Sequence, residues 1–190
     1  MAKKIIIYGI ATLAQMTKEV AMDAGLDVLG FLADFGSEEQ LSSEMYLGDF
    51  IRYQNYFQKY PVVVAIGENS SRKLISEKIV SSGGHLTNVI HPSVYISESA
   101  TLATGNILFP NAYIGMGTQV GIGNVILPGA VLSHDIVMDD YCFVAPNVTI
   151  AGFCKINSGV KFKVGGNLDS HTEVASYSTV FSSGIQGRID

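Results

Sequence analysis

The sequence predicts a chain in two parts, a small α/β domain over residues 1–88 and an all-β solenoid over residues 89–190. In the first part, short apolar runs alternate with stretches of helical spacing, which is typical of a parallel sheet flanked by helices. In the second part, a bulky apolar residue recurs at every sixth position from Ile96 to Val180, with Gly, Pro and Asn between these positions. A period of six fits neither a helix nor a flat strand, and it is typical of a solenoid.

The first part is expected to form β-α-β units, because each apolar run is followed by a segment with helical spacing. The expected elements are, in order, a strand over residues 3–9, a helix over 11–24, a strand over 28–33, a short helix within 50–57, a strand over 61–67 and a helix that ends at residue 80. Asn69 or Ser70 is expected to cap this last helix.

Ligands of parallel sheets bind at the carboxyl ends of the strands. In this chain those ends carry Gly9, Ile10, Ala11, Asp34, Gly67 and Asn69. The first loop lacks the Gly-x-Gly-x-x-Gly pattern of dinucleotide sites, but the helix that follows it offers N–H groups to a phosphate. The Asp34 carboxylate can accept hydrogen bonds from a ribose or a base. An ordinary strand-to-helix turn and a simple turn residue are the alternatives for these two features.

Three sides of six residues make one triangular coil of eighteen. The bulky residues fill the coil interior, and they are Ile96, Leu102, Leu108, Ile114, Val120, Ile126, Leu132, Met138, Val144, Ile150, Ile156, Phe162, Leu168, Val174 and Val180. Smaller residues stand two positions earlier, at Ala100, Ala112, Thr118, Ala130, Cys142, Val148, Cys154, Val160, Gly166, Thr172 and Ser178. Burial of one such aliphatic side chain contributes roughly 1.5–3 kcal/mol. A β-sandwich is the alternative, but its turns do not keep a common phase. The tail from Ser182 is rich in Gly and Ser and is expected to fray.

The composition narrows the function classes. Of the 190 residues 47% are hydrophobic and 15% are charged, which indicates a substantial core. The net charge is −5 without a run of Lys or Arg, so we expect no nucleic-acid partner. The apolar run at residues 5–8 is too short for a signal segment or a membrane span, and we expect a cytoplasmic protein without membrane insertion. Cys142 and Cys154 fall at small inward positions and are expected to be buried free thiols.

His134 differs from the other three histidines because Asp135 follows it at an edge of the solenoid. Imidazole titrates near neutrality, and a neighbouring carboxylate fixes its tautomer and stabilises its cation. A plain surface histidine is the alternative. His134 and His171 are out of phase by one residue and two coils apart, and no further histidine lies among the hexads, so we expect no metal site. No Gly-x-Ser-x-Gly pattern is present, and a serine triad is therefore unsupported.

Several motifs together suggest a family. They are Ile7-Tyr8-Gly9; Gly30-Phe31-Leu32-Ala33-Asp34; Val64-Ala65-Ile66-Gly67-Glu68-Asn69 followed by Arg72; Ile90-His91-Pro92-Ser93; and Leu132-Ser133-His134-Asp135 with Ala151-Gly152 downstream. In these motifs the chain resembles the bacterial sugar acyltransferases of the sialic acid O-acetyltransferase and bacillosamine N-acetyltransferase type. That resemblance covers nearly the whole chain. It implies a Rossmann-like nucleotide-sugar-binding domain followed by a left-handed parallel β-helix of hexapeptide repeats.

The resemblance also implies roles for single residues. It implies a homotrimer that holds acetyl-CoA between neighbouring solenoids, with His134 as the general base and Asp135 orienting it. It places Gly152, as a backbone donor, and Phe143 at the acyl-CoA; Phe143 stands where many relatives carry a second histidine. It places the nucleotide-sugar contacts on Gly9, Ile10, Ala11, Asp34, Gly67 and Asn69.

The expected function is transfer of an acyl group, acetyl foremost, from CoA to an amino group of a nucleotide-linked amino or dideoxy sugar for surface glycan biosynthesis. Two alternatives stay open at this point. One is O-acetylation of a sugar hydroxyl, as on a sialic acid. The other is a non-catalytic trimer that binds a nucleotide sugar.

Overall fold

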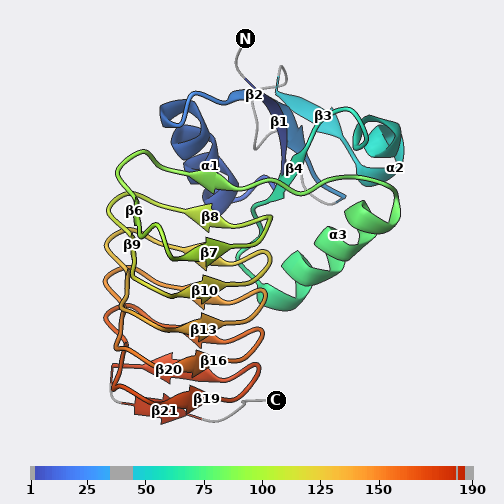
Figure 1. The fold of residues 1–190 in the computed structure, drawn as a ribbon. Helices are drawn as coiled ribbons and strands as arrows, with labels where there is room; N and C mark the ends of the chain where they lie inside the picture. The colour runs from blue at the N-terminus through green and yellow to red at the C-terminus, as the bar shows by residue number, and fades with distance from the viewer. Residues whose placement is uncertain (1–2, 35–44, 183, 187–190) are drawn as a thin grey trace.

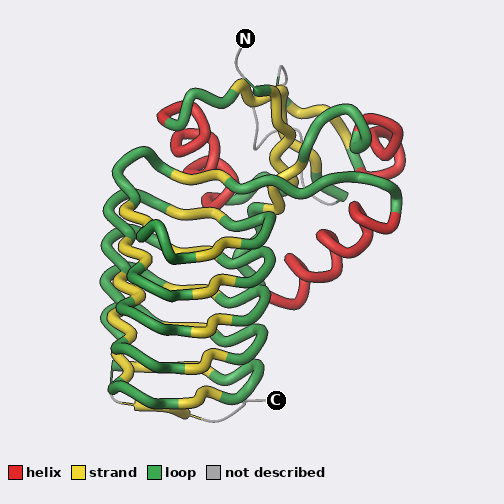
Figure 2. The backbone as a smooth tube through the Cα atoms, viewed as in Figure 1, coloured by secondary structure: helices red, strands yellow, loops and turns green. Residues whose placement is uncertain are grey.

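The structure is a computed structural model that describes residues 3–34, 45–182 and 184–186. An α/β unit sits at one end of a column of stacked coils (Figure 1). In the part of the chain that the structure describes, the helices belong to the α/β unit, whereas the column consists of short strands joined by turns (Figure 2). The elements of the α/β unit are β1 Lys4–Tyr8, α1 Thr12–Asp23, β2 Asp27–Leu32, β3 Tyr46–Gly48, α2 Phe50–Tyr53, the 3-10 helix η2 Gln54–Tyr56, β4 Val62–Val64 and α3 Asn69–Ser81.

The four strands of the α/β unit form one parallel sheet, sheet A, in the order β3-β2-β1-β4. Side chains alternate between its faces. Ile5 and Ile7 pack with α1 on one face, and Ile6 and Tyr8 pack with α2 and α3 on the other. The predicted parallel sheet with flanking helices is confirmed. Strand β3 was not expected, because three residues carry too little apolar pattern to mark a strand; residues 35–44 before it lie outside the described residues.

The column contains three further sheets, each with one strand from every coil. Its strands are β5 Val89–Ile90, β6 Tyr95–Ile96, β7 Thr101–Leu102, β8 Ile107–Leu108, β9 Tyr113–Ile114, β10 Gln119–Val120, β11 Val125–Ile126, β12 Val131–Leu132, β13 Val137–Met138, β14 Phe143–Val144, β15 Thr149–Ile150, β16 Lys155–Ile156, β17 Lys161–Phe162, β18 Asn167–Leu168, β19 Glu173–Val174, β20 Thr179–Phe181 and β21 Gly184–Gln186. Sheet B is β21-β20-β17-β14-β11-β8-β5, sheet C is β18-β15-β12-β9-β6, and sheet D is β19-β16-β13-β10-β7. The chain runs around each coil from sheet C to sheet D to sheet B. The predicted triangular solenoid is confirmed.

The tail departs from expectation. Strand β21 pairs antiparallel with β20, so the chain does not fray at residues 184–186. Residues 187–190 of the expected frayed tail lie outside the described residues.

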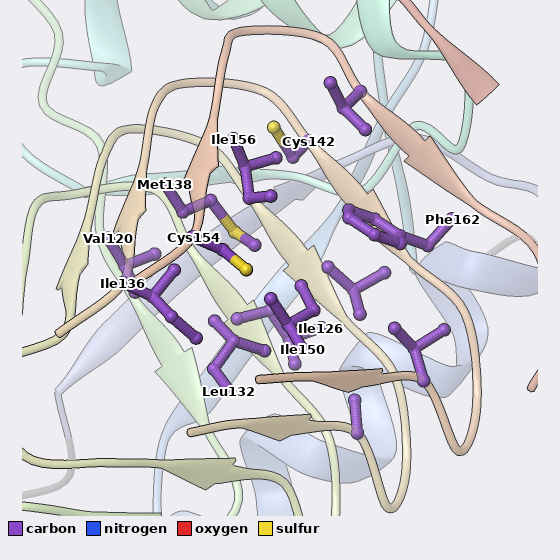
Figure 3. Close-up of a cluster of buried hydrophobic side chains, with 14 of the residues drawn as sticks. Val120, Ile126, Leu132, Ile136, Met138, Cys142, Ile150, Cys154, Ile156 and Phe162 are labelled. Carbon is purple, nitrogen blue, oxygen red and sulfur yellow. The ribbon is translucent and has the colours of Figure 1, made fainter. Parts of the chain in front are cut away.

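The interior of the column is filled by the two registers that the sequence predicts. From Leu108 to Val180 every sixth residue is buried, and Figure 3 shows Ile126, Leu132 and Ile150 packed together between the sheets. Cys142 and Cys154 are buried and free, as expected. Each coil therefore rests on the next through contacts eighteen residues apart, which is why the pattern is visible in the sequence.

An asparagine ladder crosses the first coils at three inward positions. The side-chain oxygen of Asn88 accepts from the N–H of Asn106 at 2.8 Å, and that of Asn106 accepts from the N–H of Asn124 at 2.8 Å. The ladder ends where the oxygen of Asn124 accepts from the N–H of Cys142 at 2.7 Å. These bonds satisfy backbone donors at the coil turns, so polar side chains are tolerated inside the column.

The α/β unit docks on sheet B. Ile107 and Val125 from sheet B join Ile5 and Ile7 of β1 in one apolar cluster. A second contact is made by Arg72 of α3, which is 0% exposed and donates to backbone oxygens of Gly123, Tyr141 and Cys142 at the turns between sheets D and B. The two parts are therefore joined by an apolar patch and by a buried guanidinium.

Candidate functional site

A cavity of about 390 Å³ opens at the carboxyl edge of sheet A. Its lining is Tyr8, Gly9, Ile10, Ala11, Ala33, Asp34, Ala65, Ile66, Gly67, Ser71, Leu74 and Ile75. Five of the six residues expected at a nucleotide sugar, all but Asn69, line this single cavity. They meet there because the carboxyl ends of neighbouring parallel strands lie at one edge of the sheet.

Gly9 is needed where the first loop crosses the end of β4. Its φ is +127°, and a Cβ at this position would lie 2.6 Å from the carbonyl oxygen of Ala65. The loop then enters α1, whose N-cap Ala11 makes no side-chain hydrogen bond and whose first turn has no acidic residue. Among the described residues the first N–H groups of α1 thus have no side-chain cap, and such donors favour an anion.

The Asp34 carboxylate follows β2 at the edge of this cavity. Its Oδ1 accepts from the N–H of Phe50 at 3.0 Å, and its Oδ2 lies 3.7 Å from Nζ of Lys78. Each carboxylate oxygen can accept a further hydrogen bond. Asp34 is therefore held in place by the protein and still has acceptor capacity for a ligand.

Tyr8 lines the cavity beside Asp34, and the sequence did not single it out. It is 2% exposed, and its hydroxyl is enclosed beside the Asp34 carboxylate. Burial, and after it the Asp34 carboxylate, raises the pKa of Tyr8 above the ordinary tyrosine value, so the hydroxyl stays protonated. The one sequence feature that could have indicated Tyr8 is its hydroxyl, a polar group at the end of a strand that is otherwise apolar from Ile5.

Asn69 is placed differently from expectation. It is buried, its Nδ2 donates to the carbonyl oxygen of Gly159 at 2.8 Å, and its Oδ1 accepts from Arg72 at 2.8 Å. It lines another cavity of about 450 Å³ between α3 and the column. The structure therefore does not bring Asn69 to the cavity that the other five expected residues line, because its amide ties α3 to the solenoid.

The prediction that Asn69 or Ser70 caps the helix α3 is also corrected. Glu68, and not Asn69 or Ser70, is the N-cap of α3, where its carboxylate accepts from the N–H groups of Ser70 at 3.1 Å and Ser71 at 2.6 Å. Burial alone would raise the pKa of Glu68, but hydrogen bonds from Ser71 and Ser70 outweigh it and lower that pKa to about 2. Unlike α1, α3 therefore supplies its own anion.

His134 and Asp135 occupy the vertex of the column between sheets C and D. Nδ1 of His134 lies 3.0 Å from Oδ2 of Asp135, and both side chains are partly exposed, at 45% and 42%. An ionised carboxylate only accepts, so the neutral ring donates through Nδ1–H and keeps Nε2 as a free acceptor. Asp135 adopts a left-handed φ of 53°, which turns the chain back at this vertex.

Gly152 lies one coil away, directly beneath this imidazole. A Cβ at Gly152 would stand 2.5 Å from Cε1 and 2.6 Å from Nε2 of His134, so only glycine leaves the ring its place. Next to it, Phe153 meets the His134 ring edge-on at 5.0 Å and stacks on His171 at 4.8 Å. The structure therefore adds Phe153 and His171 to the surroundings of His134, which sequence reasoning did not foresee.

Phe143 lies elsewhere in the chain. It is half-buried on β14 in sheet B, with Nζ of Lys161 5.6 Å from its ring centroid. In a triangular coil the vertex between sheets C and D faces sheet B across the interior. One chain consequently does not bring Phe143 next to His134 and Gly152, so the expected acyl-CoA contacts of Phe143 and Gly152 stay a prediction that involves two neighbouring subunits.

No group of three or more His, Cys, Asp or Glu side chains that could hold a metal ion occurs among residues 3–34, 45–182 and 184–186. Within the same ranges, no helix has the length and apolar character needed to cross a membrane.

Comparison with known proteins identifies the architecture. Residues 4–79 match the family described as the PglD N-terminal domain. The acetyltransferase domain of PglB from Neisseria gonorrhoeae FA1090, in complex with acetyl coenzyme A, superposes with a TM-score of 0.86 at 19% identity and covers 99% of this chain and 100% of that chain.

Two further solved structures are similar over their whole length. The first is GDP-perosamine N-acetyl transferase from Caulobacter crescentus, in a variant with one histidine replaced by alanine and in complex with CoA and GDP-perosamine. It has a TM-score of 0.83 at 19% identity, and the match covers 100% of this chain and 98% of that chain. WeeI from Acinetobacter baumannii AYE has a TM-score of 0.73 at 15% identity, covering 98% and 100%. These likenesses confirm the expected fold class, a Rossmann-like α/β domain followed by a left-handed parallel β-helix.

Proposed function

We propose that this chain is an acyl-CoA-dependent sugar acyltransferase. Residues 4–79 match the PglD N-terminal domain family, and the fold of the whole chain is similar to that of the two sugar acetyltransferases above. The preferred acyl group is acetyl, and the acceptor is the amino group of a nucleotide-linked sugar that is used for surface glycan synthesis. The observation that carries this proposal is the His134–Asp135 pair, with its free Nε2, at an open vertex of the column. The cytoplasmic location expected from the sequence stays a prediction.

The geometry of the vertex fits general-base catalysis. As the neutral amine nitrogen attacks the thioester carbonyl, Nε2 of His134 takes its proton and a C–N bond forms. The C–S bond then breaks, and the thiolate of CoA receives the proton from the imidazolium. Asp135 stabilises the imidazolium in between. No acceptor for the N–H of Gly152 is found among the described residues, which leaves that N–H free for the developing oxyanion.

The placement of the two halves of the site supports an oligomer. The α/β unit with its cavity docks on sheet B, whereas His134 occupies the opposite vertex. The vertex that carries His134 also exposes apolar side chains, Met116 at 60% and Phe153 at 50%. A homotrimer, in which the vertex of one subunit meets the cavity of a neighbour, brings the sugar amine, the thioester and His134 together.

A first experiment tests activity directly. Wild-type protein is incubated with acetyl-CoA and a panel of UDP- and dTDP-linked 4-amino sugars, and thiol release is followed while the product is analysed by mass spectrometry. The proposal predicts one N-acetylated product per thiol released. Release of thiol with acetylation only at a hydroxyl would establish the O-acetyltransferase alternative instead. Light scattering is expected to give three times the mass of the 190-residue chain.

A non-catalytic trimer that binds a nucleotide sugar is the second candidate. Phe143 favours it, because an aromatic ring offers no hydrogen-bond donor to a thioester or a diphosphate. Calorimetry separates the candidates. The enzyme is expected to bind both a nucleotide sugar and CoA, while binding of the nucleotide sugar with no affinity for CoA at millimolar concentration would establish the non-catalytic trimer.

A further inference from the structure

Phe153 has a backbone conformation that does not suit its side chain. Its φ is +61°, in the left-handed region, where a bulky residue is an outlier and where Gly, Asn, Asp and His are the usual residues. The matching corners of the neighbouring coils have the same conformation, and they carry Asp135 and His171. Since better suited residues occupy the same turn in the next coils, the phenylalanine calls for an explanation outside the turn itself.

Packing within the column explains two tyrosines that share this conformation at the vertex between sheets D and B. Each tyrosine ring lies on a glycine of the preceding coil. A Cβ at Gly123 would stand 2.5 Å from the ring of Tyr141, and a Cβ at Gly159 would stand 2.5 Å from the ring of Tyr177. The ring of Phe153 instead lies against two imidazoles, and the residue is 50% exposed. Burial therefore contributes little to keeping a phenylalanine at this corner.

Both the backbone and the ring of Phe153 contact His134. The N–H of Phe153 donates to the carbonyl oxygen of His134 at 3.1 Å. The two rings form a T-shaped pair, with centroids 5.0 Å apart and an angle of 87° between their planes. The ring of Phe153 is itself stacked on His171 of the following coil, at 4.8 Å and 10°. Aromatic rings attract each other in both arrangements, so Phe153 is held by one imidazole and contacts the other.

The imidazole of His134 needs such a neighbour, because its other contacts restrain it from two directions only. Asp135 contacts Nδ1 at 3.0 Å, but both side chains are partly exposed, so water competes for this hydrogen bond. Gly152 lies beneath the ring and leaves room for it. A rigid aromatic ring at a third position limits the rotation of the imidazole about its bond to Cβ.

We propose that Phe153 is a positioning residue, whose ring keeps the imidazole of His134 turned so that Nε2 stays next to Gly152. The inference rests on the proposed function, in which Nε2 takes the proton of the attacking amine. The strained φ of Phe153 is then retained for the reaction and not for stability, as happens at active sites. A shift of about 1 Å at a reacting group can cost about 100-fold in rate, so a ring that prevents it matters.

Phe153→Gly is the first test, because glycine adopts the left-handed conformation without strain while the ring is lost. We expect a melting temperature within about 3 °C of the wild type. In steady-state thiol release from acetyl-CoA, we expect kcat to fall by about tenfold or more, with KM for acetyl-CoA and for the amino sugar within about twofold of the wild type. A lower melting temperature with unchanged kcat would make Phe153 a structural residue. A raised KM for acetyl-CoA with unchanged kcat would make it a binding residue, and either result overturns the proposal.

Two further variants are the controls for Phe153→Gly. Phe153→Tyr retains the aromatic ring, and we expect its kcat to stay within about twofold of the wild type. Tyr177→Gly makes the same kind of change at a left-handed corner of another vertex, the one between sheets D and B, and should leave kcat unchanged. If Tyr177→Gly lowered kcat as much as Phe153→Gly, loosening of any corner would suffice and the contact with His134 would not be the cause.

A measurement without turnover separates this inference from the proposed function. The ¹⁵N spectrum of the His134 ring, recorded on the full chain at about pH 8 where imidazole is neutral, reports which ring nitrogen carries the proton. The wild type is expected to show mainly the Nδ1–H tautomer, and Phe153→Gly a mixture of both tautomers, because the freed ring turns away from Asp135. An unchanged spectrum in Phe153→Gly would overturn the positioning role. A wild type with the expected spectrum but no acetyl transfer to any amino sugar would overturn the proposed function alone.

Discussion

Because Gly152 contacts the His134 ring, adding one methyl group at Gly152 tests whether the position of that ring matters for the reaction. Gly152→Ala would place a Cβ 2.5 Å from Cε1 of His134 and push the imidazole away from its present position. Because the displaced group is a partly exposed side chain, folding stability should change little. A displacement near 1 Å at a reacting group can cost about 100-fold in rate, so we expect kcat to fall by about tenfold or more.

Ser170→Ala is the control for this prediction, measured by steady-state thiol release alongside the glycine variant. Ser170 occupies the corner position that follows Gly152 by one coil, and its side chain is exposed. Its replacement should leave kcat unchanged. A Gly152→Ala enzyme with wild-type kcat would mean that the ring position seen here does not matter for the reaction.

At the residue scale the sequence predicted the His134 pair and most of the cavity, because both follow from local order. A carboxylate next to a histidine and polar residues at strand ends are visible without a structure. The roles of Tyr8 and Asn69 were not, since each depends on what packs against it. The hydroxyl of Tyr8 is enclosed beside the Asp34 carboxylate, and Asn69 is turned to Gly159 by the docking of α3.

Among the elements, α3 depends on its cap. Glu68→Gln removes the charge that accepts from Ser70 and Ser71 at the helix N-terminus, and we expect a loss of about 1 kcal/mol in the free energy of unfolding at pH 7. The sign of the pH dependence follows from the lowered pKa of Glu68, about 2 against an ordinary 4.5. This stabilisation is present above pH 4.5 and is lost as the pH falls toward 2.

Urea unfolding of both proteins at pH 7 and pH 3 measures this effect, and the gap between them should narrow at the lower pH. Glu77→Gln is the control on the same helix, because the ion pair of Glu77 with Lys73, at 3.9 Å, is exposed to solvent. If Glu77→Gln lowered the free energy of unfolding as much as Glu68→Gln does, the cap at Glu68 would not be what stabilises α3.

The two helices also explain why one expectation about the elements was wrong. Asn69 and Ser70 have the usual cap chemistry, and nothing local ranks Glu68 above them. The choice was made by tertiary contacts, which commit the Asn69 amide to the solenoid and to Arg72. At the start of α1, Ala11 makes no side-chain cap hydrogen bond to the described residues, and this difference favours α1 over α3 as the end that binds an anion.

For the whole molecule, Arg72 is the residue on which the junction depends most. Its guanidinium also donates to the carbonyl oxygen of Ile66 at 2.8 Å, so one side chain links the cavity wall to the turns of the column. Burial lowers the pKa of Arg72 to about 10, and it remains charged at neutral pH. Arg72→Met would leave several buried oxygens unpaired, and we expect it to cost about 3 kcal/mol or more in unfolding free energy.

Chemical denaturation checks this value, with Lys73→Met as the control, since the neighbouring Lys73 is a partly exposed residue of α3. That control should unfold within about 1 kcal/mol of the wild type. Weaker nucleotide binding is expected only for Arg72→Met, through the Ile66 carbonyl. Unaltered stability of Arg72→Met would show that the apolar patch alone joins the two parts.

The column was predictable from sequence and the junction was not, for one physical reason. Each coil repeats the same contacts at a fixed separation, so the inward registers from Leu108 to Val180 imprint a period on the chain. The junction is made once, by Arg72 and a patch around Val125, and leaves no repeat to detect. The asparagine ladder escaped notice similarly, because it spans only the first coils.

The central proposal is that Nε2 of His134 is the general base of the reaction, and one kinetic comparison tests it most directly. Initial rates of thiol release from acetyl-CoA are measured for the wild type and His134→Ala, at saturating nucleotide-linked amino sugar, with nucleotide binding checked by calorimetry. We expect kcat to fall by about 1,000-fold while nucleotide affinity is unchanged, since general-base catalysis typically contributes about 10²–10⁴-fold in rate. A His134→Ala enzyme that works within a few-fold of the wild-type rate would contradict it.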